Sequence, residues 1–128
     1  MDRLRRRLAS SEGFTLIELL VVIVIIGILL AIAIPSYLGF RKQAQDTAGK
    51  ANVREAVPSA ESYFANNGNY SGMTTGALKA IDSGLSPSVS IGYANASSYC
   101  LKAPGQQSTT WYFAGPGGSV TSVQPAGC

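Results

Sequence analysis

The sequence predicts an α+β fold in which a long N-terminal helix packs against a small antiparallel β-sheet. Three observations predict it. Residues 14–34 form an almost unbroken apolar run, apolar side chains then recur at helical spacing to about residue 66, and from Ser88 onward the period changes to two. With 128 residues, the chain has room for one small domain beside the hydrophobic segment.

The apolar run from Phe14 to Ile34 is long enough to cross a lipid bilayer. Its 21 residues make a helix about 31 Å long, which matches a hydrocarbon core of about 30 Å. Glu18 is the one charged residue inside it. An unpaired carboxylate costs roughly 2.5–3.5 kcal/mol at the bilayer centre and less towards an end. The run therefore predicts a transmembrane helix, residues 14–35, whose single acid needs a partner.

Residues 1–13 are predicted to be a cytoplasmic leader. Such a cluster of basic residues before an apolar run holds that end of the helix in the cytoplasm; its members are Arg3, Arg5, Arg6 and Arg7. The chain has three possible fates: cleavage as a secretory signal after Ala31-Ile32-Ala33, retention as an uncut anchor, or cleavage after Gly13. The first conflicts with the length of the apolar run and with its internal acid.

Cleavage after Gly13 gains support from simple electrostatics. It would create an ammonium group on Phe14, and Glu18 lies four residues further on, one helical turn away. A carboxylate near a helix N-terminus is also favoured by the helix dipole. The amine, from the same chain or a neighbour, would offset the cost of placing Glu18 among apolar groups.

Residues 36–66 are predicted to continue the helix as an amphipathic stretch. Its apolar positions lie on two shifted faces: Tyr37, Phe40, Ala44, Ala48 and Ala51, then Val53, Ala56, Ala60 and Phe64. The alanines among these positions would let a neighbouring helix approach closely, and residues 57–64 are expected to pack under the globular part. Asp46 precedes Lys50 by four residues, which predicts an exposed ion pair. Pro58 lacks a backbone N–H, so a kink is expected near residues 54–58.

Residues 67–128 are predicted to form a small β domain. Gly68 suits the left-handed turn that ends a helix, and residues 75–81 favour a short helix. Alternating runs separated by turn residues follow at 89–94, 99–103, 110–114 and 120–123. We expect an antiparallel meander of three or four strands over the C-terminal half of the helix, because so small a domain has too little core alone.

The two cysteines, Cys100 and Cys128, belong to a chain with an export segment, which favours a disulfide over two unpaired thiols. It would close a loop of about 29 residues and contribute roughly 3–4 kcal/mol in the chain-entropy model. The sequence contains no histidine, so the pair makes a poor metal site.

Catalysis, cofactor binding and nucleic-acid binding are not expected. There is no histidine to serve as general base and no nucleophile-elbow or phosphate-loop glycine pattern. Glu55, Glu61 and Asp82 are scattered and expected to be solvated. From Phe14 onward six basic residues face five acidic ones, so the basic excess lies in the leader and no specific nucleic-acid site is evident.

The N-terminal region resembles that of a type IV prepilin. The features are the arginine-bearing leader, then Gly13-Phe14-Thr15-Leu16-Ile17-Glu18, then an apolar run that ends at Pro35. The resemblance implies that a prepilin peptidase cuts between Gly13 and Phe14 and N-methylates Phe14. It implies that Glu18 pairs with the Phe14 amine of an adjacent subunit during assembly. It also implies that the helix between Gly27 and Pro35 unwinds inside the filament, and a pilin-like fold whose C-terminal disulfide loop corresponds to Cys100–Cys128.

The implied function is that of a fimbrial structural subunit. A single-pass precursor in the cytoplasmic (inner) membrane would be built by a membrane assembly platform into an extracellular homo-oligomeric filament, of the kind that serves adhesion and motility. Alternatives are a pseudopilin of type II protein secretion, or a minor pilin in adhesion or DNA uptake. No acid follows Asp82 to form the C-terminal calcium loop of major pseudopilins, and a DNA or adhesin surface has only Lys79 and Lys102 as cations.

Overall fold

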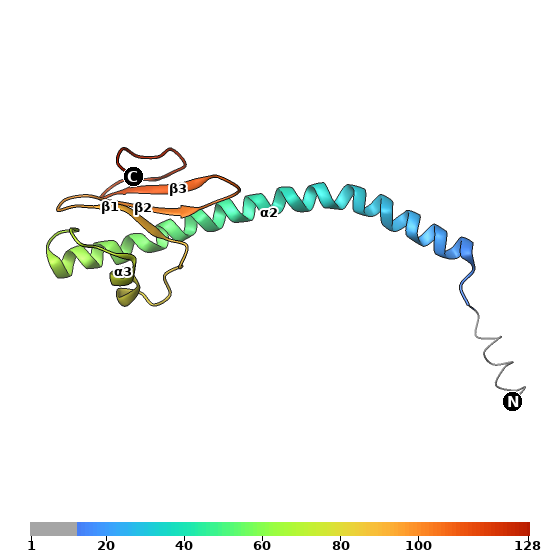
Figure 1. Cartoon of the computed structure of the whole chain (residues 1–128), viewed down its shortest axis with the longest axis horizontal. Helices are drawn as coiled ribbons and strands as arrows, with labels where there is room; N and C mark the ends of the chain where they lie inside the picture. The colour runs from blue at the N-terminus through green and yellow to red at the C-terminus, as the bar shows by residue number, and fades with distance from the viewer. Residues whose placement is uncertain (1–12) are drawn as a thin grey trace, which may run out of the picture. The chain divides into compact units, whose positions relative to one another are not determined.

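The computed structural model describes residues 13–128, so the predicted leader lies outside the described residues except for Gly13. The elements follow one another along the chain (Figure 1): α2 (Leu16–Asn67), α3 (Thr75–Ile81), β1 (Ser90–Ala94), β2 (Tyr99–Pro104), β3 (Thr110–Gly115) and β4 (Val120–Thr121). This confirms the predicted fold class, a long apolar N-terminal helix with a small antiparallel sheet. The chain divides into two compact units at Gly39/Phe40, and we describe each by itself.

Helix α2 presents one buried stripe within the second unit. Its buried residues are Gly49, Val53, Ala56, Ser59 and Ala60. Steps of three and four residues keep these positions on one face of a helix, and their small size lets the sheet approach closely. Phe64, which was expected on this face, is exposed. Pro58 does not interrupt α2, which is helical without a break from Leu16 to Asn67.

The four strands form one antiparallel sheet in the order β1-β2-β3-β4, which is the predicted meander. In the central strand β2, Tyr99, Leu101 and Ala103 are buried against the core. The core is one cluster: Val53, Ala56, Ala60, Tyr70, Met73, Leu78, Leu85, Val89, Tyr99, Leu101 and Ala103. One face of the sheet thus covers the second half of α2, with Leu78 of α3 closing the same core.

Strand β1 contains a bulge at Gly92 that the alternating pattern did not predict. Ile91 lies opposite Leu101, whereas Tyr93 lies opposite Cys100, so Gly92 is an extra residue in the ladder. Because side chains alternate along a strand, the bulge places Ile91 on the core face and Tyr93 on the outer face. Val89, Ile91 and Tyr93 therefore do not share one face, as strict alternation would require.

The bulge makes room for the disulfide. Cys100 and Cys128 are bonded, with their Cα atoms 5.9 Å apart, and the bond ties the C-terminal segment across the outer face of the sheet. A Cβ atom on Gly92 would lie only 2.5 Å from Sγ of Cys128. Only a residue without a side chain lets the C-terminal cysteine approach β1 so closely.

Glu61, which was expected to be solvated, joins the helix to the sheet. Its Oε2 accepts a hydrogen bond from the hydroxyl of Tyr70 at 2.9 Å, and its Oε1 accepts one from the hydroxyl of Tyr99 at 3.0 Å. Both tyrosines are almost fully buried. Burial, reinforced by the hydrogen bond to Glu61 and by its charge, raises the pKa of both phenols above the ordinary value. We call these three residues the Glu61 clasp.

Asp46 makes a second connection, which replaces the predicted ion pair with Lys50. Its Oδ1 accepts hydrogen bonds from the backbone N–H of Gln106 at 3.0 Å and from Nε1 of Trp111 at 3.2 Å. The Lys50 ammonium instead lies 4.4 Å from the centre of the Trp111 ring, a cation–π contact. The Trp111 indole and the β2–β3 loop hold these hydrogen-bond donors in fixed positions beside Asp46. The flexible Lys50 side chain therefore packs on the Trp111 ring instead of pairing with Asp46. Asp46, Gln106 and Trp111 form what we call the Asp46 clasp.

Candidate functional site

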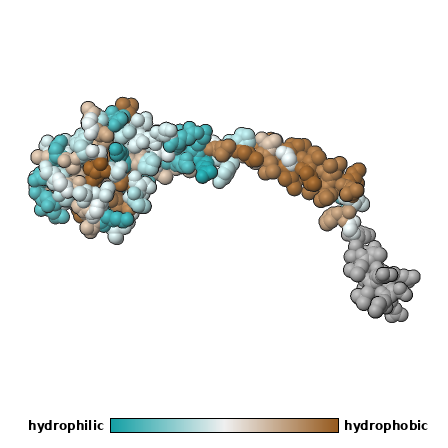
Figure 2. All heavy atoms as spheres, viewed as in Figure 1, coloured by the Kyte–Doolittle hydropathy of each residue, from teal (hydrophilic) through white to brown (hydrophobic). Residues whose placement is uncertain are grey.

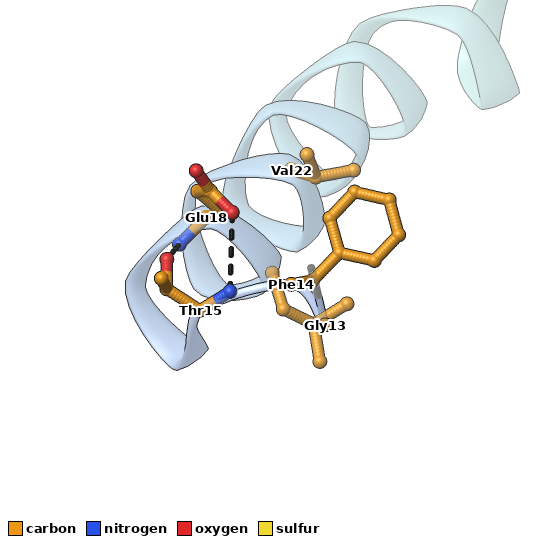
Figure 3. Close-up of a pocket in the computed structure, with 6 residues that line it drawn as sticks. Gly13, Phe14, Thr15, Glu18 and Val22 are labelled. Atoms are coloured by element: carbon orange, nitrogen blue, oxygen red, sulfur yellow. Dashed lines mark hydrogen bonds between the residues drawn. The ribbon is translucent and has the colours of Figure 1, made fainter. Parts of the chain in front are cut away.

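Three of the predicted processing and assembly residues, Gly13, Phe14 and Glu18, lie at the start of α2 (Figure 3). Gly13, Phe14 and Thr15 precede the first helical residue, Leu16, and all are exposed. The carboxylate of Glu18 points back over the first turn, where its Oε2 accepts a hydrogen bond from the backbone N–H of Thr15 at 3.1 Å. The backbone N–H of Glu18 in turn donates to Oγ1 of Thr15 at 3.3 Å.

This reciprocal pair is a capping box. The first turn of a helix leaves backbone N–H groups without partners inside the helix, and the Thr15 and Glu18 side chains satisfy two such groups. Glu18 therefore has a hydrogen-bond partner within its own subunit, in addition to the favourable end of the helix dipole. One carboxylate oxygen is engaged by this contact, and the other makes no hydrogen bond among the described residues.

Sequence reasoning missed Thr15 as a functional residue. The predicted partners of Glu18 are an amine on Phe14 and the helix dipole, and neither involves the Thr15 side chain. The signal was present, because a threonine followed three residues later by a glutamate, just before an apolar run, is the capping-box signature. The residue that positions the carboxylate could have been read from Thr15-Leu16-Ile17-Glu18.

The helix beyond this turn exposes its apolar side chains. Phe14 and Leu16 are each 88% exposed, and no side chain in residues 13–39 is buried. Figure 2 shows the resulting hydrophobic surface along the N-terminal half of α2. By length and composition, α2 contains a segment able to cross a membrane. A surface of this kind is stable only in lipid or against other apolar surfaces.

Gly27 and Pro35, the positions expected to loosen the helix in a filament, are both helical in the single chain. A Cβ atom on Gly27 would meet nothing within 4 Å, so no neighbour within the described chain requires a glycine there. Glycine costs about 1 kcal/mol in a helix interior relative to alanine, and proline removes one backbone donor. The segment between them is thus intrinsically weaker than the flanking helix.

Three acidic side chains of the second unit are each engaged in separate hydrogen bonds. Asp46 and Glu61 are engaged in the clasps, and Asp82 accepts a hydrogen bond from the backbone N–H of Gly84 at 2.9 Å. Within residues 13–128, no three side chains among Cys, Asp and Glu are grouped so as to hold a metal ion. Among the described residues, the candidate functional site is the start of α2, where Thr15 and Glu18 form the capping box.

Comparisons with known proteins agree with this location. A family model described as the prokaryotic N-terminal methylation motif matches residues 8–34. The type IV wide pilus major component PilA4 of Thermus thermophilus is 40% identical over 131 residues, covering 93% of this chain and 98% of that protein.

Two further relatives match about half of this chain. The type IV narrow pilus major component PilA5 of Thermus thermophilus is 43% identical over 79 residues, covering 50% of this chain and 68% of that protein. The type IV major pilin protein PilA of Myxococcus xanthus is 39% identical over 69 residues, covering 54% of this chain and 31% of that protein.

Proposed function

The chain belongs to the type IV pilin family and is a structural pilus subunit, and from this premise we propose how its residues perform that task. The precursor is cut between Gly13 and Phe14 by a prepilin peptidase, which also methylates the new amine of Phe14. The subunit waits in the cytoplasmic membrane and is then moved by an assembly platform into a surface filament of identical copies. The names of the relatives, which are major pilus components, favour a pilus over a secretion pseudopilus.

The observation that carries this proposal is the exposed apolar helix in residues 14–34. Its large side chains have about half or more of their surface exposed. Each buried methylene group contributes roughly 0.8 kcal/mol, so lipid first and neighbouring helices afterwards supply a strong driving force for burial. Polymerisation is the outcome that buries this surface outside the membrane.

Glu18 sets the register between neighbouring subunits. Apolar helices slide past one another at little cost, whereas a single charge pair fixes their relative position. The capping box leaves one oxygen of Glu18 open, so the carboxylate can keep its bond to Thr15 and also accept the Phe14 ammonium of an adjacent copy. In a water-poor filament core this attraction is stronger than at a surface.

Two measurements test the proposal. Mass spectrometry of sheared surface filaments should find an abundant N-terminal peptide that begins at methylated Phe14. The variant Glu18→Leu should be cleaved normally and remain in the membrane, with filaments lost. Glu55→Leu, which removes an exposed carboxylate from the same helix, is the matched control and should still assemble.

Two outcomes would contradict it. A mature protein that begins at Met1, or beyond Ala33, would remove both the amine and the cut that creates it. Filaments formed at wild-type abundance by Glu18→Leu would show that register does not depend on this carboxylate. A plain membrane anchor instead predicts that Glu18→Leu inserts better into the membrane and loses nothing else, since leucine improves insertion of the helix.

A further inference from the structure

The outer face of the sheet carries a hollow whose position follows from the strand pairing. Tyr99, Leu101 and Ala103 of β2 face the core, so Cys100 and Lys102 lie on the opposite face. The disulfide covers the Cys100 end of that face with the C-terminal segment. Figure 1 shows this segment on the side of the sheet away from α2. The Lys102 end is left open.

Three strands contribute to the open end. Lys102 lies opposite Ser90 of β1 and opposite Tyr112 of β3, which places an ammonium, a hydroxyl and a phenol side by side. They surround a shallow hollow of about 230 Å³, which we call the Lys102 hollow; its lining is Ser90, Lys102, Ala103, Pro104, Thr110 and Tyr112. Each of these residues except Ala103 has an exposed or half-buried side chain.

The open end of this face carries a single charged side chain. Lys102 is the one charged side chain in residues 83–128. The carboxylates of Asp46 and Glu61 lie on α2, on the other side of the sheet, where the clasps engage them. Within the part of the chain that the structure describes, residues 13–128, no carboxylate lies within ion-pair distance of Lys102. An ammonium without an ion-pair partner in its own chain attracts an anion from outside the chain.

We propose that the Lys102 hollow binds an anionic group of an acidic polysaccharide. The ammonium pairs with a carboxylate or sulfate, the hydroxyls of Ser90 and Thr110 hydrogen-bond sugar hydroxyls, and the ring of Tyr112 packs on the apolar face of a sugar. A single such site is weak. The inference rests on the proposed function, because a filament repeats the site along its length and so converts weak binding into avidity.

Nucleic acid is a poorer match for the same face. Double-stranded DNA carries a charge about every 1.7 Å, and proteins that bind it neutralise several phosphates together. The outer face of the sheet offers one cation, so its electrostatic gain on DNA is small. In a polysaccharide with one anionic group per sugar, these groups repeat at wide spacing. One cation on each subunit is therefore enough to pair with them.

The test uses sheared filaments of the wild type and three variants, sedimented with polygalacturonate, dextran sulfate, neutral dextran or duplex DNA. Lys102→Gln should raise the half-saturating concentration of polygalacturonate at least about tenfold, because a small loss at each site is multiplied along the filament. Lys102→Arg retains the charge and should stay near the wild type. Lys79→Gln removes an equal charge from α3 and is the matched control. Dextran should not bind, and the dextran sulfate arm shows whether sulfate serves as well as carboxylate.

Three results would overturn the inference. They are equal binding by wild type and Lys102→Gln, an equal loss in Lys102→Gln and Lys79→Gln, and a loss of duplex DNA binding without a loss of polysaccharide binding. Electron microscopy of the same samples reports assembly separately. If a variant forms no filaments, the full-length chain in detergent micelles, coupled at high density to beads, gives the same comparison. A wild type that lacks filaments yet binds through Lys102 on beads would count against the proposed function alone.

Discussion

The two halves of α2 are built for different partners. In residues 16–39 no side chain is buried, whereas in residues 40–67 a stripe of small residues packs under the sheet. Their carboxylates differ in the same way. Glu18 bonds a residue three positions away, whereas Glu61 reaches Tyr99, 38 residues along the chain, and Asp46 reaches Trp111, 65 residues along.

The difference shows how one helix can serve two assemblies. The C-terminal half is completed by its own chain, because its polar groups find donors on the sheet and its stripe is covered. The N-terminal half satisfies only its backbone, through the capping box, and leaves its apolar surface for lipid or other copies. Substitutions at buried or hydrogen-bonded positions of the C-terminal half should therefore change the stability of the domain, and those in the N-terminal half should not.

The largest effect is expected from Glu61→Leu. It leaves two buried tyrosine hydroxyls without an acceptor, at about 1–3 kcal/mol each, so the free energy of unfolding should fall by about 2–6 kcal/mol. Urea unfolding of the full chain in micelles, followed by the fluorescence of Trp111, the single tryptophan, measures it. Glu55→Leu should change the value by no more than about 0.5 kcal/mol. Equal losses in both variants would remove the special role of the clasp.

High pH should weaken the same clasp. The pKa values of Tyr70 and Tyr99 are raised in the folded chain, so above about pH 10 the unfolded chain releases protons that the folded chain retains. The stabilisation is complete below pH 10 and is lost as the pH rises, by up to about 2.7 kcal/mol per pH unit for two groups. Tyr99→Phe should roughly halve this slope in urea titrations from pH 9 to 11. An unchanged slope would contradict the assignment.

Alanine substitutions of two glycines should affect the stability of the domain differently in the two halves of α2. A Cβ atom on Gly49 would lie 2.7 Å from the carbonyl oxygen of Pro104 and 2.9 Å from Cδ1 of Trp111, so Gly49→Ala should destabilise the domain by about 1–3 kcal/mol. Gly39→Ala meets nothing within 4 Å and gains helix propensity. The same urea assay should show a loss for the first and none for the second. A loss for Gly39→Ala would mean that the halves are not independent.

The smallest effect should be confined to the helix tip. Thr15→Val keeps the shape of the side chain but removes the oxygen that accepts from the Glu18 backbone, which costs about 1 kcal/mol of capping. Hydrogen exchange at the Glu18 amide should accelerate by roughly fivefold, as a 1 kcal/mol change implies. Unfolding monitored at Trp111 should stay the same. A fall in the stability of the domain would contradict the independence of the two halves of α2.

Much of the fold could be predicted because periodicity reports local structure directly. The short helix at 75–81 and the positions of the four strands follow from turn residues and alternation. Strand β4 is shorter than expected because the backbone N–H of Val123 donates to Oγ1 of Thr121, which ends the ladder and leaves Val123 exposed. Local hydrogen bonds of this kind compete with pairing and leave little trace in an apolar pattern.

The sequence by itself determined the apolar helix, the position of its one acid, the signature Thr15-Leu16-Ile17-Glu18 and the order of the strands, since each depends on residues close together in the chain. Only the tertiary structure decided that Glu61 and Asp46 are joined to the sheet, that Gly92 forms a bulge and that Lys102 faces an open hollow. Those contacts depend on the register between segments tens of residues apart. A one-residue change in register exchanges the two faces of a strand, so spacing along the chain does not determine them.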